Sequence, residues 1–230
     1  MSEKEKLPAK KHEGIDIGGS YQKVLDFYTH HQNLIFGILI GILLLGAGIF
    51  AFFKFYQQPR NVKAMNAIAQ AQGYFERDSL IMALDGDDNA EGFTTIADKY
   101  SGTSAGNLAK YYAAVCYVKL KDNDAALNYL KKYRKNNQTF GAAAYTLMGD
   151  IYLENGDSQK ALKHYKDAAD KKSLAFSPVA MLKSAMVLET MDKWDDAYKM
   201  YSKIEKNYYD AYSKMNLETF KERAKEKAGK

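Results

Sequence analysis

The sequence contains few of the residues from which disulfide-rich, metal-binding or sheet-forming domains are built. Its 230 residues include one cysteine (Cys116), three prolines, one tryptophan and four histidines. A single cysteine excludes an intramolecular disulfide and a zinc site made of several cysteines. So little proline, in a chain with long runs rich in alanine and lysine, favours helix over sheet. The composition therefore predicts an all-α chain.

Recognisable sites of chemistry are also missing from the sequence. It has no glycine loop that would hold a phosphate, and the acidic stretch "LDGDDNAEGF" lacks the glycine and the terminal glutamate of a calcium loop. His30 and His31 point about 100° apart on a helix and have no acidic partner at metal-binding spacing. We therefore expect no catalytic residue, no cofactor, no metal and no small-molecule substrate. Cys116 is interpreted as a packing residue and His164 as a surface residue.

The net charge of +5 is spread along the chain. Residues 1–33 contain five lysines and five acidic residues, and residues 54–230 contain 28 basic and 23 acidic residues that are interspersed. Mixed charge of this kind is typical of solvated helix faces. The charge pattern therefore does not indicate binding to nucleic acid.

One stretch of the chain carries no charge. Leu34–Phe53 is a run of 20 residues, and a helix of that length matches a hydrocarbon core of about 30 Å. Tyr28 precedes the run, and Phe55 and Tyr56 follow it, as in the aromatic belt of a membrane interface. A cleaved signal peptide is disfavoured, because residues 1–33 form a long polar leader and no small-residue cleavage site follows. The stretch is predicted to remain as a transmembrane helix in the lipid bilayer.

Small residues share one face of this predicted span. Gly37, Gly41 and Gly48 fall within about 40° of one another on a helix, with Ala51 close by. The spacing includes a G-x-x-x-G pattern, which lets a second transmembrane helix approach closely. We expect this face to pack against a partner helix.

The stretch "GDIYLENGDSQKALKHY" gives the organisation of the rest of the chain. An aromatic-x-x-Leu-Gly-x-x-Tyr pattern is followed by a turn glycine and by small and aromatic residues at intervals of four and three. The residues that form this pattern are Tyr145, Met148, Gly149, Tyr152, Gly156, Ala161, Tyr165 and Ala168. The pattern resembles the tetratricopeptide repeat, a helix–turn–helix of about 34 residues, with Ser173 where a proline usually falls.

Packing explains why small residues stand at these positions. Two antiparallel helices approach closely only where side chains are small, which predicts close contacts at Gly149 and Ala161. Gly156 can adopt a positive φ and end the first helix without strain. The alanine of the second helix recurs as Ala126, 35 residues before Ala161, and as Ala197, 36 residues after it.

The two outer copies of the repeat are weaker, since Lys121 and Asp192 replace the turn glycine. The predicted fold is a single N-terminal transmembrane helix followed by a tetratricopeptide-like α-solenoid. Its expected parts are a cytoplasmic tail (1–33), the span (34–53), a long helix with a degenerate first helix pair (54–103), three repeats (104–207), and a capping helix with a charged tail (208–230).

The concave face of the repeats is the remaining candidate site. It is expected at fixed positions of the first helices, and it is mainly apolar. The candidate residues are Leu108, Tyr111, Val115, Thr146, Asp150, Val179, Leu182 and Met186. Lys183 is the only basic residue at the positions where chaperone-binding repeats place lysine and asparagine, so a clamp for a charged tail is disfavoured. An apolar groove would suit a hydrophobic peptide or a partner helix. The alternative is that the last helix or a loop fills it.

The order of these parts resembles the YfgM-type ancillary subunit of the bacterial SecYEG translocon. The resemblance covers nearly the whole chain and rests on "LIFGILIGILLLGAGIFAFF", the long helix from Pro59, "GFTTIADKYSGTSAGNLAKYYAAVCYV" and the later repeats. It implies a bacterial inner-membrane protein with a cytoplasmic N-terminus and periplasmic repeats. The implied partners are the SecYEG translocon and a PpiD-like periplasmic chaperone, and no site residue is carried over.

Two other interpretations share the same features. An organelle import receptor of the mitochondrial outer membrane has a similar order but keeps its repeats in the cytosol, and a scaffold for another envelope complex would look alike. Charge does not decide the orientation, because Lys23 lies on one side of the span and Lys54, Arg60 and Lys63 lie on the other.

Overall fold

The structure, a computed structural model, describes the backbone of residues 17–229 and the side chains of Gln22 and residues 27–229. The part of the predicted cytoplasmic tail that spans residues 1–16 lies outside the described residues. The chain divides into two compact units, one ending at Tyr56 and the other running from Gln57 to the C-terminus.

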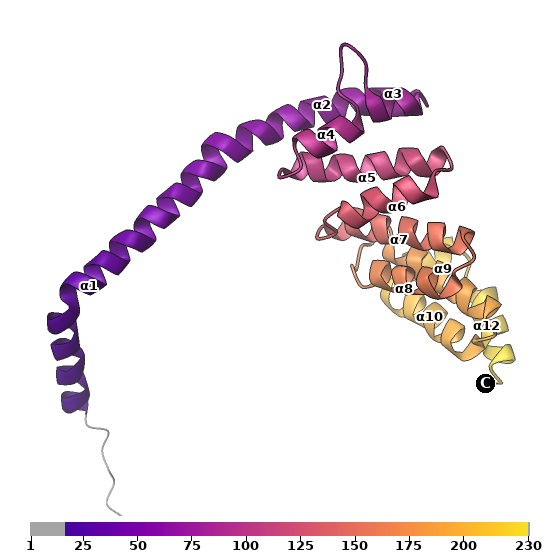
Figure 1. Cartoon of the computed structure of the whole chain (residues 1–230). Helices are drawn as coiled ribbons and strands as arrows, with labels where there is room; N and C mark the ends of the chain where they lie inside the picture. The colour runs from indigo at the N-terminus through magenta and orange to yellow at the C-terminus, as the bar shows by residue number, and fades with distance from the viewer. Residues whose placement is uncertain (1–16, 230) are drawn as a thin grey trace, which may run out of the picture. The chain divides into compact units, whose positions relative to one another are not determined.

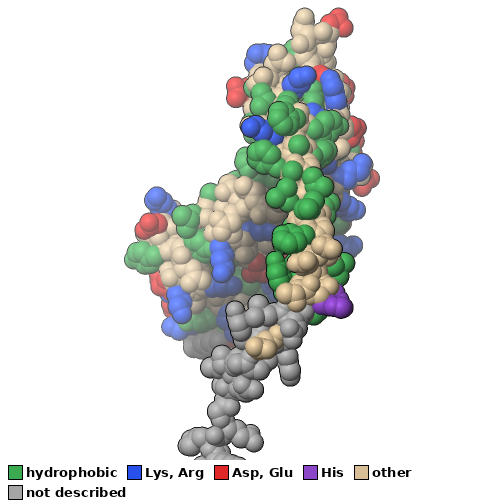
Figure 2. Space-filling view, turned by 90° about the vertical axis from the view of Figure 1, so that its left-hand side faces the viewer, with side chains coloured by type: hydrophobic (Ala, Val, Ile, Leu, Met, Phe, Trp, Pro, Cys, Tyr) green, Lys and Arg blue, Asp and Glu red, His purple; other side chains and the backbone are tan. Residues whose placement is uncertain are grey.

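The first unit is helical throughout its described part. Helix α1 spans Ile17–Ala51 and is followed by a π-helical stretch, η1, over Phe52–Gln57. The helix thus begins 17 residues before the apolar run that starts at Leu34. Hydrophobic side chains gather along it (Figure 2), and those of Leu43 and Leu45 are 70% and 69% exposed. Among the described residues one helix, Phe27–Glu76, is long and apolar enough to cross a membrane.

Pro59 lies where η1 gives way to helix α2 (Gln58–Glu76). It sits in the first turn of α2, as predicted, but Gln57, two residues before it, has helical dihedral angles (φ −72°, ψ −42°), so the helix continues. Proline has no N–H, and in a regular helix its ring collides with the carbonyl group four residues earlier. The wider π turn gives that carbonyl room, which explains why η1 directly precedes the proline.

The second unit is a stack of helix pairs (Figure 1). After α2 come two short helices, α3 (Leu80–Asp85) and α4 (Phe93–Lys99). The remaining helices are α5 (Ser104–Lys119), α6 (Asn123–Lys132), α7 (Gln138–Glu154), α8 (Ser158–Ala169), α9 (Ser177–Thr190), α10 (Trp194–Asn207), α11 (Tyr209–Lys214) and α12 (Glu218–Lys227). Residues 17–229 contain no β-strand and one isolated bridge, between Gly86 and Glu91. The predicted all-α solenoid behind an N-terminal apolar helix is confirmed.

The same type of turn ends five helices: α2, α5, α7, α9 and α11. After α7, the amide of Asp157 donates to the Tyr152 carbonyl (2.8 Å) and the amide of Gly156 donates to the Leu153 carbonyl (3.0 Å). This is the Schellman arrangement, in which one residue adopts a left-handed conformation. That residue has a φ between 53° and 80° at each turn: Asp78, Lys121, Gly156, Asp192 and Asn216.

The turns at Lys121 and Asp192 therefore have the same backbone geometry as the turn at Gly156. A left-handed conformation is nevertheless costly for residues with a Cβ. The φ angles of Lys121 and Asp192 are 64° and 55°. The sequence analysis identified both residues as replacements for the turn glycine, and the backbone agrees.

Close packing at Gly149 is also confirmed. A Cβ built on Gly149 would lie 2.4 Å from the Tyr165 ring, so only glycine fits between α7 and α8 there. The alanines that mark the repeat in the second helices, Ala126, Ala161 and Ala197, are all fully buried. Cys116 is buried in the N-terminal core as expected, and burial raises the pKa of its thiol to about 12.

Residues 208–230 were expected to form one capping helix and a charged tail, and the described part contains two helices, α11 and α12. The break falls at Asn216, whose φ of 53° supplies the fifth turn. Asparagine tolerates this conformation better than most residues, which explains why the helix ends there. Leu217, next to the turn, is 1% exposed and α12 packs against α10.

Candidate functional site

The residues predicted to line the concave face differ widely in exposure. Met186 is 50% exposed, whereas Thr146 is 7% exposed and its hydroxyl donates to the Ala142 carbonyl of its own helix. The others are partly buried: Leu108, Tyr111, Val115, Asp150, Val179 and Leu182. The face is therefore most accessible at its C-terminal end.

Aromatic rings occupy the N-terminal end of this face. The Tyr111 ring lies 5.4 Å from the Phe140 ring, 5.8 Å from that of Tyr112 and 5.9 Å from that of Tyr133, centroid to centroid. Phe140 belongs to the next repeat, so this cluster joins α5 to α7. Burial raises the pKa of Tyr111 to about 12. Much of the Tyr111 surface is therefore used for packing between repeats.

Asp150 stands at the centre of a polar contact between three helices. The Tyr165 hydroxyl of α8 donates to Asp150 Oδ1 (2.6 Å), and Lys183 Nζ of α9 lies 2.7 Å from the same oxygen. Burial and the bond to Asp150 raise the pKa of Tyr165 well above its usual range. We call this arrangement of a tyrosine, a carboxylate and a cation from the next helix pair a polar joint.

A second polar joint lies one repeat further along. The Tyr201 hydroxyl of α10 donates to Glu189 Oε1 (2.9 Å), and Arg223 Nη2 of α12 donates to Glu189 Oε2 (2.6 Å). Tyr201 lies 36 residues after Tyr165, so the two tyrosines are equivalent in the repeat. The Glu189 side chain is 12% exposed. Burial and the bond to Glu189 raise the pKa of Tyr201.

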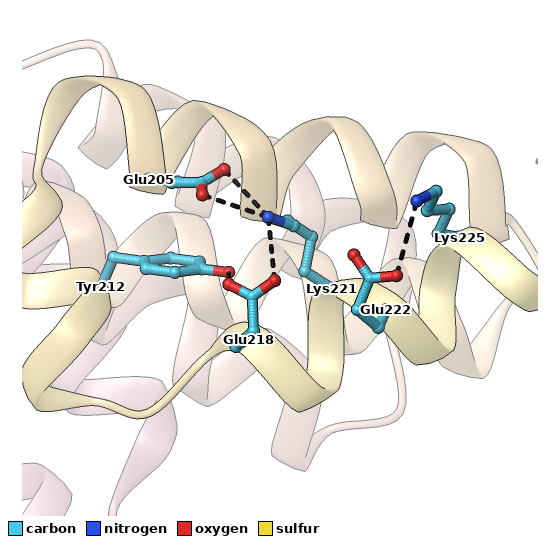
Figure 3. Close-up of polar contacts among 6 residues, drawn as sticks. All are labelled: Glu205, Tyr212, Glu218, Lys221, Glu222 and Lys225. Atoms are coloured by element: carbon cyan, nitrogen blue, oxygen red, sulfur yellow. Dashed lines mark hydrogen bonds and ion pairs between the residues drawn. The ribbon is translucent and has the colours of Figure 1, made fainter.

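The C-terminal helices carry a related cluster (Figure 3). The Tyr212 hydroxyl donates to Glu218 Oε2 (2.7 Å), and Lys221 Nζ bonds both carboxylate oxygens of Glu205 (3.1 Å each) and pairs with Glu218 (3.3 Å). Burial lowers the pKa of Lys221, but the bonds to the two glutamates outweigh it, so the net shift is upward. The Glu222–Lys225 pair beside the cluster is exposed.

The polar joints make Asp150 and Glu189 structural groups. Each carboxylate accepts a tyrosine hydroxyl and pairs with a cation, and such satisfied groups specify how neighbouring helices meet. Asp150 was expected on the concave face and Lys183 was the one basic residue at the clamp positions, but periodicity did not predict their contact. A hint was available in the recurrence of Tyr165 and Tyr201.

A shallow hollow of about 420 Å³ lies at the exposed end of the concave face. It is formed by α9, α10 and α12, and its lining comprises Met186, Glu189, Thr190, Trp194, Phe220 and Arg223. Of these, Met186 was predicted as a groove residue. Trp194 and Phe220 come from α10 and α12, which the periodicity of the first helices does not include, so no pattern in the sequence pointed to them.

The prediction that His164 is a surface residue is wrong. Its side chain is 15% exposed, and its ring stacks on those of Tyr152 (5.2 Å) and Tyr145 (6.1 Å). Burial lowers the pKa of His164, although Asp167, 3.6 Å away, acts in the opposite direction. The His164 side chain therefore packs in the contact between α8 and α7.

The glycine face of the first unit has no neighbour among the described residues. A Cβ built on Gly37, Gly41 or Gly48 would meet nothing within 4 Å, and Ala51 is exposed. The described residues also contain no group of three or more His, Cys, Asp or Glu placed to hold a metal ion.

Comparison with known proteins identifies the repeats. Residues 108–138 and 179–209 match the tetratricopeptide repeat family model. No curated protein matches the chain. The two matched segments begin 71 residues apart, which is the sum of the 35- and 36-residue spacings that separate Ala126, Ala161 and Ala197. The chain therefore contains tetratricopeptide repeats, a protein-interaction fold, behind an N-terminal apolar helix that is compatible with a single-pass membrane anchor.

Proposed function

We propose that this protein is a non-catalytic interaction subunit held at the bacterial inner membrane by α1. Its repeats engage a periplasmic chaperone or emerging secretory chains beside the SecYEG translocon. The proposal rests on the combination of tetratricopeptide repeats with an apolar helix. In the most apolar stretch of that helix no side chain is buried, so the side chains are free to face lipid. Anchoring keeps the repeats at the membrane, where a high local concentration replaces high intrinsic affinity.

Two surfaces support a role in assembly. The glycine face of α1 is open along Gly37, Gly41 and Gly48, which suits close approach by a second transmembrane helix. The hollow beside Met186 exposes apolar side chains next to an internal ion pair between Glu189 and Arg223. A hydrophobic segment would fit it better than a charged tail would.

Membrane attachment and orientation are tested first. The full chain in bacterial membranes should resist extraction by alkaline carbonate, and protease added to spheroplasts should degrade residues 54–230. Release by carbonate would indicate that the apolar helix is removed or does not span the membrane. Protection of the repeats would favour a receptor or scaffold that faces the cytosol.

Partner recovery tests the translocon assignment. The tagged chain, purified in mild detergent, should enrich SecY and a PpiD-like chaperone over an unrelated single-span protein. Gly41→Leu with Gly48→Leu should reduce that enrichment, because the close approach of helix backbones is lost. Gly46→Leu is the matched control, since Gly46 lies about 180° from Gly37 on the helix. Enrichment of other envelope proteins alone would replace the translocon with a general scaffold.

The repeat surface is tested with a second pair of variants. Met186→Lys should weaken recovery of the chaperone or secretory chains while SecY remains bound through the span. Met82→Lys is the control, because Met82 is similarly exposed (45%) but lies on α3, away from the hollow. Equal recovery with both variants would remove the hollow from the proposal.

A further inference from the structure

The loops that connect one helix pair to the next lie along one edge of the second unit, which we call the loop edge. It comprises residues 100–103, 133–137 and 170–176. The Asn107 amide of α5 bonds the backbone of Arg134 through both its nitrogen (3.2 Å) and its oxygen (2.8 Å). The Lys171 side chain reaches Gly141 at the start of α7. These contacts place the three loops side by side (Figure 1).

The second unit is attached to the apolar helix at this same edge. Gln57, its first residue, donates from Nε2 to the Gly102 carbonyl (3.2 Å), and Asn61 accepts a bond from the Ala105 amide (3.0 Å). The chain therefore enters the second unit beside the first loop. The first loop thus contacts the chain four residues after the apolar run ends at Phe53.

Positive charge collects along the loop edge. Between Tyr129 and Gly141 the chain has four basic residues and no acidic one. The ammonium groups of Lys135 and Lys171 converge on the Tyr145 ring, at 5.6 and 5.7 Å from its centroid.

These two lysines have little compensation from acidic residues. Asp167 and Asp170 are the nearest carboxylates in sequence to Lys171, and among the described residues neither Lys135 nor Lys171 takes part in an ion pair. Burial lowers the pKa of Lys135, whose ammonium donates to the Leu130 and Tyr133 carbonyls, and the neighbouring Lys171 acts in the same direction. The opposite edge has a different charge at the turn between α9 and α10. Residues 188–197, which include this turn, contain four acidic residues and one lysine.

A large apolar side chain projects from the loop of residues 170–176. Leu174 is 84% exposed, more than any other large hydrophobic side chain among the described residues, and it follows Lys171 and Lys172. Lysines beside an exposed apolar group are the pattern of surfaces that lie in a membrane interface, where the charges meet headgroups and the apolar group enters the acyl boundary.

We propose that the loop edge docks on anionic phospholipid headgroups, with Lys171 and Lys172 contacting the headgroups and Leu174 entering the interface. The inference rests on the proposed membrane anchoring. The anchor supplies proximity, so a weak contact suffices to orient the repeats on the bilayer. A nucleic acid would satisfy the lysines but would leave Leu174 without an apolar partner.

The test uses the full chain in lipid nanodiscs. Cys116→Ala removes the only cysteine, and Ala175→Cys then carries a polarity-sensitive fluorophore next to Leu174. Nanodiscs of phosphatidylcholine are compared with nanodiscs in which about one third of the lipid is phosphatidylglycerol, each with a quencher attached to the headgroups. Asn155→Cys, at an exposed turn on the opposite edge, is the control position.

Docking predicts quenching at position 175, little quenching at position 155, and a loss of the difference at high salt. Lys171→Gln with Lys172→Gln should lower the ratio of docked to undocked protein roughly 30-fold, as expected for two lysines at an anionic surface. Lys121→Gln with Lys193→Gln is the matched control, since Lys121 and Lys172 both have a positive φ.

Equal quenching at positions 155 and 175, or quenching at position 175 that does not need phosphatidylglycerol, would overturn the inference. So would protection of position 175 by an added acidic protein or nucleic acid but not by anionic lipid. Failure of the anchor is a separate result, because the chain would then be absent from carbonate-washed membranes. An anchored chain without quenching at position 175 contradicts only the docking.

Discussion

The first and second repeats share a backbone but are joined to their neighbours differently. In the second repeat, Tyr165 and Asp150 form a polar joint with Lys183 of the next helix pair. The residues 35 positions earlier are Leu130 and Val115, so the first repeat has no such joint. Where the second repeat has its polar joint, the first repeat has the aromatic cluster around Tyr111, which contacts Phe140 of the next repeat.

This difference shows that the residues that form a helix pair are distinct from the residues that join one helix pair to the next. Both repeats have a buried alanine in the second helix and a left-handed turn residue, and these make the helix pair. The contact between pairs can be aromatic or ionic without changing that pair. The stability of a repeat stack depends on nearest-neighbour interfaces of this kind as well as on the helix pairs themselves.

The largest effect is expected at Gly149. Gly149→Ala should destabilise the protein by about 2–3 kcal/mol, because the new Cβ would overlap the Tyr165 ring. Tyr165→Leu in the same chain, as in the first repeat, should recover part of that loss. Urea unfolding followed by the fluorescence of Trp194, the only tryptophan, measures both.

Gly73→Ala is the control for this change. A Cβ there meets only the Arg77 side chain at 3.8 Å, so the substitution should stabilise α2 by up to about 1 kcal/mol. Destabilisation of similar size at both glycines would show that helix packing does not explain Gly149.

Breaking a polar joint should have the next largest effect. Glu189→Leu leaves the buried Tyr201 hydroxyl and Arg223 without their acceptor, at a cost of about 1–3 kcal/mol. Glu222→Leu removes an exposed pair with Lys225 and should change the free energy of unfolding by less than about 0.5 kcal/mol. Urea midpoints that shift equally in the two variants would refute the joint.

The His164 stack should make stability depend on pH. Burial lowers its pKa in the folded state, whereas the unfolded chain titrates near the ordinary pKa of about 6.5. Below that pH the unfolded state binds more protons, so the contribution of His164 to stability is lost as the pH falls from about 6.5 towards the folded-state pKa. Three charged groups near the His164 ring also affect its pKa: Asp167 raises it, and Lys163 and Lys135 lower it.

His164→Phe keeps an aromatic ring between Tyr145 and Tyr152 and removes the titration. The difference in unfolding midpoint between pH 7.5 and pH 5.5, values that bracket the ordinary pKa of about 6.5, should be smaller in this variant than in the natural chain. An unchanged difference would assign the pH dependence to other groups.

The smallest effects are expected at the turns. Lys121→Gly and Asp192→Gly should each stabilise the protein by about 0.5–1 kcal/mol, since both residues hold a left-handed conformation that glycine adopts without strain. Gly156→Lys should lose a similar amount. Thermal melts of the three single variants compare the turns directly, and a loss at Lys121→Gly would indicate that its side chain contributes through the ion pair with Glu154.

Features that depend on neighbours along the chain could be predicted from the amino-acid order alone. The apolar run of α1, the turn residues at Lys121, Gly156 and Asp192, and the close approach at Gly149 follow from periodicity, chain reach and side-chain size within about one repeat. Such local patterns survive in any arrangement of the helix pairs.

Contacts between residues far apart in the sequence became visible only in the packed fold. Lys183 and Arg223 lie 33 and 34 positions from the carboxylates they bond, and His164 is enclosed by two tyrosines of another helix. Helical periodicity gives a side chain's direction on its own helix but not the offset between helices, so Asp150 was read as a groove residue and His164 as exposed. The offset is set by packing of all the side chains in the interface at once, because a close-packed interior admits few arrangements.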